Sequence, residues 1–161
     1  MKDRISKTNA MRILDSAKVK YVVHEYSHED TAVPGDEVAR LVGADPDRVF
    51  KTLVTRGSSG EIFVFIVPVK EELDLKKAAK YSGEKAISMV RVSELLNLTG
   101  YIRGGCTAIG MKKDYPVFLE ETASLFESIF VSGGKIGLQI ELDPEDLLRT
   151  ASGRYADLIT D

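Results

Sequence analysis

An almost wholly apolar run, Ile62–Val67, constrains the fold of this chain more than any other segment. Apolar runs of this length are typical of a strand that is buried on both faces. The preceding segment, Val49–Arg56, also has the composition of a strand, and Gly57–Gly60 between the two predicts a hairpin turn. A hairpin covered on both faces needs helices around it, so we expect an α/β (α+β) fold.

The rest of the chain mixes helices and strands without a strict strand–helix–strand rhythm. Apolar spacing and capping residues predict helices at Thr8–Lys18, Asp36–Val42, Asp74–Tyr81, Ser93–Leu98 and Asp143–Thr150. β-Branched and aromatic residues predict further strands at Tyr21–Tyr26, Ala86–Val90, Val117–Leu119, Ser128–Val131 and Ile136–Leu142. We expect one domain over residues 1–161, with a single mixed, largely antiparallel sheet and flanking helices.

The composition excludes several classes of protein. With 43% apolar and 29% charged residues, the 161-residue chain is expected to be globular and not disordered. The net charge of −3 gives no overall attraction to nucleic acid or to an anionic membrane. No apolar run has the length of a signal peptide or of a membrane span. Because Cys106 is the only cysteine, no intrachain disulfide can form, and we expect a soluble cytoplasmic protein.

Lys51 is an unusual residue in the predicted strand Val49–Arg56. Because side chains alternate along a strand, Lys51 shares a face with Val49 and Leu53. A partly buried ammonium group there can direct its charge at a carbonyl oxygen or a phosphate. The alternative is a lysine on an exposed strand edge, where its charge prevents pairing with other chains.

Two glycine-rich segments are candidates for ligand contacts. Gly104–Gly110 contains three glycines, which permit positive φ angles and let a ligand approach the backbone amides. Its spacing differs from that of a phosphate-binding P-loop, because Met111 follows where a lysine is required. The second segment, Ser132–Gly137, is equally typical of a simple hairpin turn. The first segment also remains open to interpretation as a wide structural turn.

Neither thiol chemistry nor a metal site is favoured by the sequence. Cys106 has no histidine nearby in the chain, so we interpret it as a small packed side chain. His24 and His28 lie about 13 Å apart on an extended strand, too far to share one ion, although Glu29 and Asp30 follow them. We therefore expect no metal. Tyr26, at the end of the first strand, is a candidate for the floor of a pocket.

In this order and spacing, several segments resemble the YbaK family of aminoacyl-tRNA editing domains, the Cys-tRNA(Pro) deacylases. The matching segments are His24-x-Tyr26, Gly35–Val38, Val49–Leu53, Leu73–Lys80, Thr99–Tyr101, Gly104-Gly105, Gly110–Lys113 and Val131–Leu142. The resemblance covers nearly the whole chain, from about Thr8 to Ile159. The order and spacing of the segments make the resemblance specific, whereas each single segment is less specific.

The resemblance implies a barrel-like sheet and an enzyme that hydrolyses the ester between a wrong amino acid and the terminal ribose of tRNA. It implies a catalytic role for Lys51 and attack on the ester by the thiol of the substrate cysteine itself. It also implies no cofactor, with tRNA(Pro) and prolyl-tRNA synthetase as partners. The implied substrate-binding residues are Tyr26, Gly104, Gly105, Thr107, Ala108, Gly110, Ser132, Gly133, Gly134 and Lys135.

The chain departs from close relatives at two places. Thr107-Ala108 stands where relatives carry Ser-Pro, which loosens the backbone of that loop. Gln139 stands where they carry an acidic residue, which removes a negative charge that would face the substrate's α-ammonium group. Deacylation of Cys-tRNA(Pro) is the leading hypothesis. The alternatives are deacylation of Ala-tRNA(Pro), a non-catalytic module that binds aminoacyl-tRNA or the synthetase, and a small phosphate-binding protein.

Overall fold

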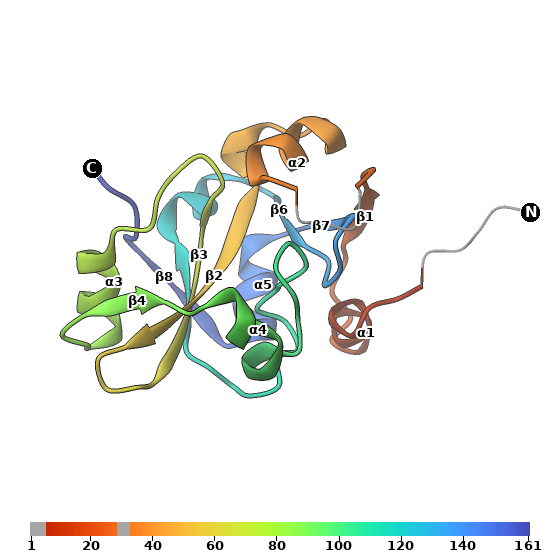
Figure 1. Cartoon of the computed structure of the whole chain (residues 1–161). Coiled ribbons are helices and arrows are strands. Elements are labelled where there is room, and N and C mark those ends of the chain that lie inside the picture. The colour runs from red at the N-terminus through yellow and green to blue at the C-terminus, as the bar shows by residue number, and fades with distance from the viewer. Residues whose placement is uncertain (1–5, 29–32) are drawn as a thin grey trace, which may run out of the picture.

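The computed structural model describes residues 6–28 and 33–161 (Figure 1). The residues Glu29 and Asp30, which were considered above for a metal site, lie outside the described ranges. The elements are α1 (Asn9–Ser16), β1 (Val22–Glu25), α2 (Gly35–Val42), the 3-10 helix η1 (Pro46–Arg48), β2 (Phe50–Gly57), β3 (Ile62–Pro68), α3 (Leu75–Ser82), β4 (Ile87–Met89), α4 (Val92–Thr99), β5 (Val117–Glu120), the 3-10 helix η2 (Glu121–Leu125), β6 (Ile129–Ser132), β7 (Leu138–Leu142), α5 (Pro144–Ala151) and β8 (Gly153–Ala156). The predicted mixed α/β class is confirmed.

Local sequence explains where the helices begin and end. The Thr8 hydroxyl accepts a hydrogen bond from the amide of Met11 at the start of α1, as an N-cap does. The Asp143 carboxylate caps α5 in the same way. Gly43, with a φ of 71°, ends α2 in the left-handed conformation that glycine adopts at low cost. The short strand β8 was not predicted, because Gly153–Ala156 has neither an apolar run nor a clear alternation.

The strands form two sheets in the described part of the chain. One has three antiparallel strands in the order β1-β7-β6, and the other has five in the order β4-β2-β3-β5-β8. Only β3-β5 and β5-β8 are parallel pairs among these ladders. An isolated bridge between Val49 and Phe130 links the two sheets. The sheet is therefore mixed and largely antiparallel as predicted, but it is divided in two and does not close into a barrel.

The strand β2 pairs fully with β3 on one edge and only partly on the other edge. On that second edge, β4 pairs with Thr55–Gly57, and β6 reaches only the bridge at Val49. Within the described residues, Phe50–Leu53 has no strand partner on this side. We call this segment the open edge of β2. Side chains from other elements line the space between the two sheets at this edge.

The core confirms that Ile62–Val67 is buried on both faces. Val64 and Ile66 pack in a large apolar cluster with residues of α1 and α5. Phe63 and Phe65 pack on the opposite face with residues of α3. In Figure 1, α3 accordingly lies on the other side of the five-stranded sheet from α5. No helix in the described ranges is long and apolar enough to span a bilayer.

Candidate functional site

A cavity of about 140 Å³ lies at the open edge of β2, where the two sheets meet. We call it the Lys51 cavity. It is lined by Tyr26, Val33, Gly35, Val38, Val49, Phe50, Lys51, Thr52, Val69, Gly104, Cys106, Ser132 and Gln139. Lys51 is the one charged side chain among these residues. A small, mostly apolar cavity with one cation and a few polar groups has the composition of a site for a small polar ligand.

The half-buried Lys51 is the second residue of β2 and lies opposite Val67 of β3. Partial burial, one of the two alternatives that the sequence left open, is therefore observed, although the residue also lies on the open edge of β2. In the described part of the chain, no hydrogen bond or ion pair involves its ammonium group. A partly desolvated charge without a partner is available to a ligand, and its interaction with an oxygen atom is stronger than in open water.

Gln139 supplies a second unpaired polar group to the Lys51 cavity. It is the second residue of β7 and lies opposite His24 on one side and Ser132 on the other. The residue is only 6% exposed, and its Oε1 atom is buried without a hydrogen-bond partner among the described residues. Leaving such an acceptor unsatisfied costs about 1–3 kcal/mol. A ligand that donates a hydrogen bond to Gln139 would remove this cost.

The two glycine-rich loops contact each other beside the cavity. Gly104, with a φ of 88°, lines the Lys51 cavity. The next residue, Gly105, approaches the second loop so closely that a Cβ atom there would lie 3.0 Å from the Cα of Lys135. Glycine at this position therefore allows the loops to touch. The contact between the loops holds the neighbouring Gly104 in its position at the wall of the Lys51 cavity.

The second half of the first loop faces away from the Lys51 cavity. Thr107 is fully buried, and Ala108 packs in the large apolar cluster. A Cβ atom at Gly110 would lie 2.7 Å from side-chain atoms of both Asn9 and Ile13, so this glycine makes room for α1. Ala108 and Gly110 line a separate cavity. These three residues therefore do not line the Lys51 cavity, and their predicted contact with substrate stays a prediction.

The second loop contributes one side chain to the Lys51 cavity, that of Ser132. Gly133 accepts a hydrogen bond from the Thr8 hydroxyl at 2.6 Å, which ties the loop to the start of α1. Gly134 has a φ of 102° and donates its amide to the Ser132 hydroxyl oxygen. Lys135 is exposed and lines another cavity. The two glycines thus shape the turn that positions Ser132.

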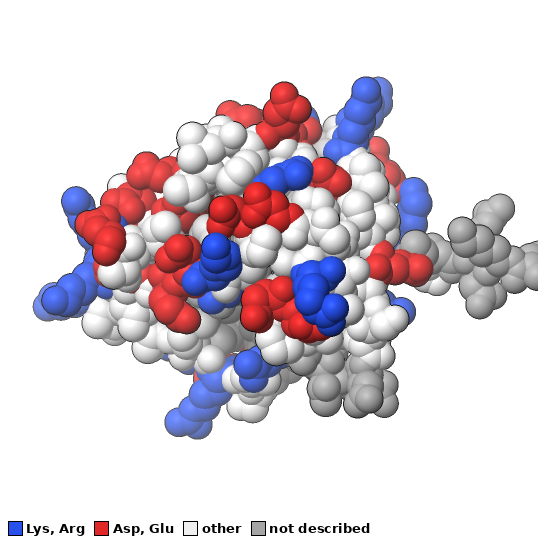
Figure 2. Space-filling model, turned by 90° about the horizontal axis from the view of Figure 1, so that it is seen from above, with Lys and Arg blue, Asp and Glu red and all other residues white. Residues whose placement is uncertain are grey.

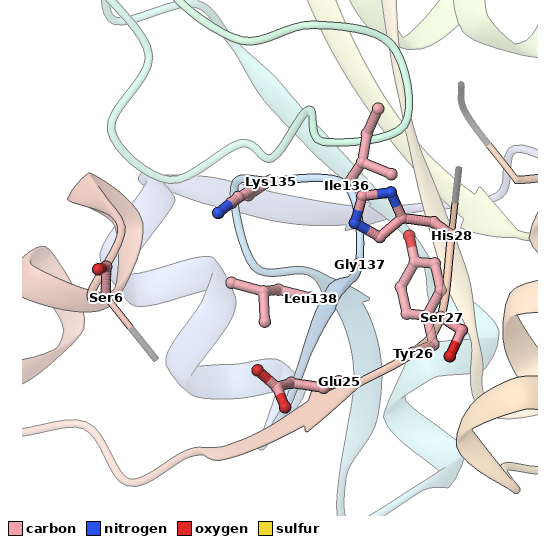
Figure 3. A pocket seen from close by; sticks show the side chains of 9 residues that line it. All are labelled: Ser6, Glu25, Tyr26, Ser27, His28, Lys135, Ile136, Gly137 and Leu138. Carbon is pink, nitrogen blue, oxygen red and sulfur yellow. The ribbon is translucent and has the colours of Figure 1, made fainter. Parts of the chain in front are cut away.

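That other cavity has a volume of about 470 Å³ and adjoins the Lys51 cavity at Tyr26 (Figure 3). We call it the Lys135 cavity. The hydroxyl end of Tyr26 points toward the imidazole of His28, and the ring centroids are 6.3 Å apart (Figure 3). The imidazole packs so tightly over Gly137 that a Cβ there would lie 2.5 Å from it. The described residues contain no cluster of side chains that could hold a metal ion.

Cys106 lines the Lys51 cavity but is poorly suited to act as a nucleophile. It is 8% exposed, and burial raises the pKa of its thiol to about 12. The thiol is therefore protonated at neutral pH. No histidine or carboxylate is among the described residues that line this cavity. The cavity consequently offers positioning and positive charge, and no evident general base.

Sequence reasoning missed the wall that α2 contributes. Gly35 and Val38 of this helix line the cavity together with Val69, which follows β3. A Cβ atom at Gly35 would lie 2.7 Å from Val69, so the glycine allows α2 to pack against this residue. In the sequence, Gly35 indicates no more than the start of a helix. Its partner is 34 positions away, and only the fold reveals the contact.

A polar network fixes the strands behind the cavity. Glu141 of β7 accepts a hydrogen bond from the Ser128 hydroxyl at 2.6 Å, and it pairs with His24 of β1 at 3.0 Å and with Arg48 of η1 at 3.1 Å. The bond from Ser128, followed by those from His24 and the charge of Arg48, lowers the pKa of the Glu141 carboxyl. The network thereby joins β1, η1 and Ser128, the residue before β6, to the strand that carries Gln139.

Replacement of this carboxylate gives a test of the network. We expect Glu141→Gln to lower the free energy of unfolding at neutral pH by about 1–2 kcal/mol. A carboxyl whose pKa is lowered by folding stabilises the protein above its unfolded pKa, and this contribution is lost as the pH falls through the folded pKa. The difference between wild type and variant should therefore shrink from about pH 6 to about pH 3. Urea unfolding followed by circular dichroism measures it, and a difference independent of pH would contradict this role.

Several known proteins are similar to this chain in sequence or structure. The family model described as the aminoacyl-tRNA editing domain matches residues 28–150. The protein EbsC of Enterococcus faecalis, named as a Cys-tRNA(Pro)/Cys-tRNA(Cys) deacylase, is 45% identical over 154 residues, which are 96% of this chain and 94% of the relative. A crystal structure described as a trans-editing enzyme for prolyl-tRNA synthetase has a TM-score of 0.80 at 26% identity, covering 97% of this chain and 100% of that chain. The hypothetical protein APE2540 shares the fold, with a TM-score of 0.82 at 17% identity over 92% of this chain and 97% of its own.

Proposed function

The chain belongs to the aminoacyl-tRNA editing domain family, and we propose that it is a deacylase that removes cysteine mischarged onto tRNA(Pro). The observation that carries this proposal is the pair of unpaired polar groups in one small cavity, the Lys51 ammonium and the Gln139 carbonyl oxygen. The name of the EbsC relative supports the choice of substrate. We further propose that residues 1–161 act as one editing domain.

Each of the two polar groups has a distinct part in this proposal. The Lys51 ammonium faces the carbonyl oxygen of the ester and stabilises the negative charge that develops on it. The Gln139 oxygen accepts a hydrogen bond from the α-ammonium group of the amino acid, which satisfies its unpaired acceptor. Ser132 and Gly104 border the space between them. The four groups come from β2, β7, β6 and the first glycine-rich loop, so the folded chain holds them in place before substrate binds.

The substrate's own thiol is the nucleophile in this mechanism. A free cysteine thiol has a pKa of about 8.5, so part of it is thiolate at neutral pH without help from a protein base. The sulfur attacks the carbonyl carbon of its own ester, a carbon–sulfur bond forms, and the bond to the ribose oxygen breaks. That oxygen takes up a proton from water. Water then hydrolyses the cyclic thioester and releases cysteine.

The surface charge of this domain is too weak to bind the body of the tRNA by itself. The net charge is −3, and Figure 2 shows acidic and basic side chains interspersed over the face that carries α2. Such a surface attracts a polyanion only weakly. We therefore propose that prolyl-tRNA synthetase presents the mischarged tRNA. The crystal structure described as a trans-editing enzyme for that synthetase supports this arrangement.

The proposal is tested by measuring deacylation of tRNA(Pro) charged with cysteine, alanine or proline. We expect Cys-tRNA(Pro) to be hydrolysed at least about 100-fold faster than Pro-tRNA(Pro), because proline has no thiol that could attack its own ester. A parallel assay with Cys-tRNA(Cys) shows how far the enzyme distinguishes tRNAs. Preferential hydrolysis of Ala-tRNA(Pro) would establish the sister specificity. Failure to accelerate any of these reactions would contradict the enzymatic function.

A further inference from the structure

A further cavity, of about 330 Å³, continues from the Lys51 cavity along the open edge of β2. The two cavities share Thr52, Gly104 and Cys106 as wall residues. The new cavity lies between β4, α4 and the first glycine-rich loop, the green segments that lie together in Figure 1. We call it the α4 groove. A ligand that enters the Lys51 cavity from this side has its remaining part in the α4 groove.

The α4 groove and its surroundings expose large apolar side chains. Met89 and Val92, which line the groove, are 49% and 60% exposed. Leu96 and Ile102, on the helix and loop around it, are each 52% exposed. Their exposure is a cost that a contact with a partner would relieve. The patch is therefore a candidate contact surface.

Two arginines accompany this apolar surface. Arg91 and Arg103 line the groove, both are exposed, and no carboxylate is among its lining residues. Within the described ranges, neither guanidinium group forms a salt bridge, although the Glu94 carboxylate accepts a hydrogen bond from the Arg91 backbone amide and its charge interacts with that of Arg91. Arg56, by contrast, is paired with Glu94 at 2.8 Å. The groove thus presents two available positive charges beside an apolar surface, which suits a strand that carries phosphates and bases.

We propose that the α4 groove binds the single-stranded 3′ end of the charged tRNA. This inference rests on the proposed function, since it places the nucleotides that precede the ester. The terminal ribose lies at the boundary formed by Thr52 and Gly104, with the aminoacyl group in the Lys51 cavity. Arg91 and Arg103 bind the phosphates, and Met89 and Val92 contact the bases.

The Lys135 cavity is a less suitable path for the same strand. It shares only Tyr26 with the Lys51 cavity, whereas the α4 groove shares three residues. Glu25 also lines the Lys135 cavity and would repel phosphates (Figure 3). A single cation, Lys135, lines it among the described residues. Lys135→Ala is therefore the variant that tests the rival path.

The test compares two cysteinyl esters, Cys-tRNA(Pro) and the cysteinyl ester of adenosine, which has no phosphates. We expect the double variant Arg91→Ala/Arg103→Ala to lower kcat/KM for Cys-tRNA(Pro) by about tenfold or more. The loss should be absent with the adenosine ester. Val92→Asp, which adds a negative charge on an exposed position, should also weaken the reaction with the tRNA. Lys20→Ala removes an exposed cation that lines none of the described cavities and serves as the control.

A binding assay gives a readout that does not depend on catalysis. Fluorescence anisotropy with an uncharged RNA oligonucleotide ending in CCA measures affinity at several salt concentrations. The slope of log affinity against log salt should decrease by about 0.7 for each arginine removed. An unchanged slope, or equal losses with both esters, would overturn the assignment of the α4 groove. A loss of activity or affinity in the Lys135→Ala variant alone would also overturn this assignment, and it would place the strand in the Lys135 cavity.

The two proposals fail in different ways. If wild-type protein hydrolyses neither ester, the proposed function is wrong. If wild-type protein hydrolyses both and the arginine variant behaves like Lys20→Ala, only the α4 groove is wrong. Binding of the oligonucleotide that depends on Arg91 and Arg103 would support the groove even if the hydrolysis assay failed.

Discussion

Replacing Lys51 with alanine is expected to lower the single-turnover rate of Cys-tRNA(Pro) deacylation by about 100- to 1,000-fold. This is the typical loss when an enzyme loses one group that stabilises a developing oxyanion. The effect should fall on the rate at saturating enzyme more than on binding, because the ammonium interacts most strongly with the charged transition state. Lys51 is the only charged residue that lines its cavity among the described residues, so no neighbour can replace it.

Two further measurements make this result specific. The Lys51→Ala variant should remain as resistant to urea as wild type, because the ammonium has no partner in the described structure whose loss would destabilise the fold. Lys51→Arg keeps the charge but changes its shape, so we expect partial activity. Wild-type rates in Lys51→Ala would exclude Lys51 from the site. A parallel loss of stability and activity would show a structural effect instead.

Replacing Gln139 with leucine is expected to change activity and stability in opposite directions. The variant lacks the acceptor for the substrate's α-ammonium group, so kcat/KM for Cys-tRNA(Pro) should fall by about tenfold or more. The same change removes a buried oxygen that has no partner, so the free energy of unfolding should rise by about 1 kcal/mol. Chemical denaturation and the deacylation assay measure the two effects on one preparation.

Gln139→Glu is the matched control, because it keeps the shape of the side chain and adds a negative charge. It should retain binding of the α-ammonium group, and it should destabilise the protein without substrate because the carboxylate is buried. If Gln139→Leu loses both stability and activity, the side chain is structural. If it loses neither, Gln139 does not contact the substrate.

The sequence predicted the elements well because each depends on local patterns. The apolar run of β3, the hairpin before it and the caps at Thr8 and Asp143 all formed as expected. Periodicity raised the partial burial of Lys51 as one of two alternatives, since neighbouring apolar residues define the face of a strand, and it could not decide between burial and an exposed edge. It gave no information on which strands are neighbours. The bridge between Val49 and Phe130, which links the two sheets, joins residues 81 positions apart.

The site was only partly predictable, because sequence patterns do not reveal which strands and loops are neighbours in the fold. Tyr26, Lys51, Gly104 and Ser132 come together in one cavity, as the resemblance implied for a pocket. Ala108 and Gly110 instead pack against the core and α1, because the loop turns inward after Cys106. The orphan acceptor of Gln139 and the groove beside Arg91 depend on side chains from several elements. The resemblance pointed to the position of Gln139, but neither its unsatisfied acceptor nor the groove has a signature in the linear sequence.

The central claim is that the cavity supplies position and charge, while the substrate supplies the nucleophile. The most direct test is single-turnover deacylation of tRNA(Pro) charged with cysteine or with serine, which differ only in sulfur and oxygen. We predict that the cysteinyl ester is hydrolysed at least about 100-fold faster, because a hydroxyl group is not ionised at neutral pH and the cavity offers no evident base to activate it. Equal rates for the two esters would contradict the claim, because a base on the protein would then have to activate water.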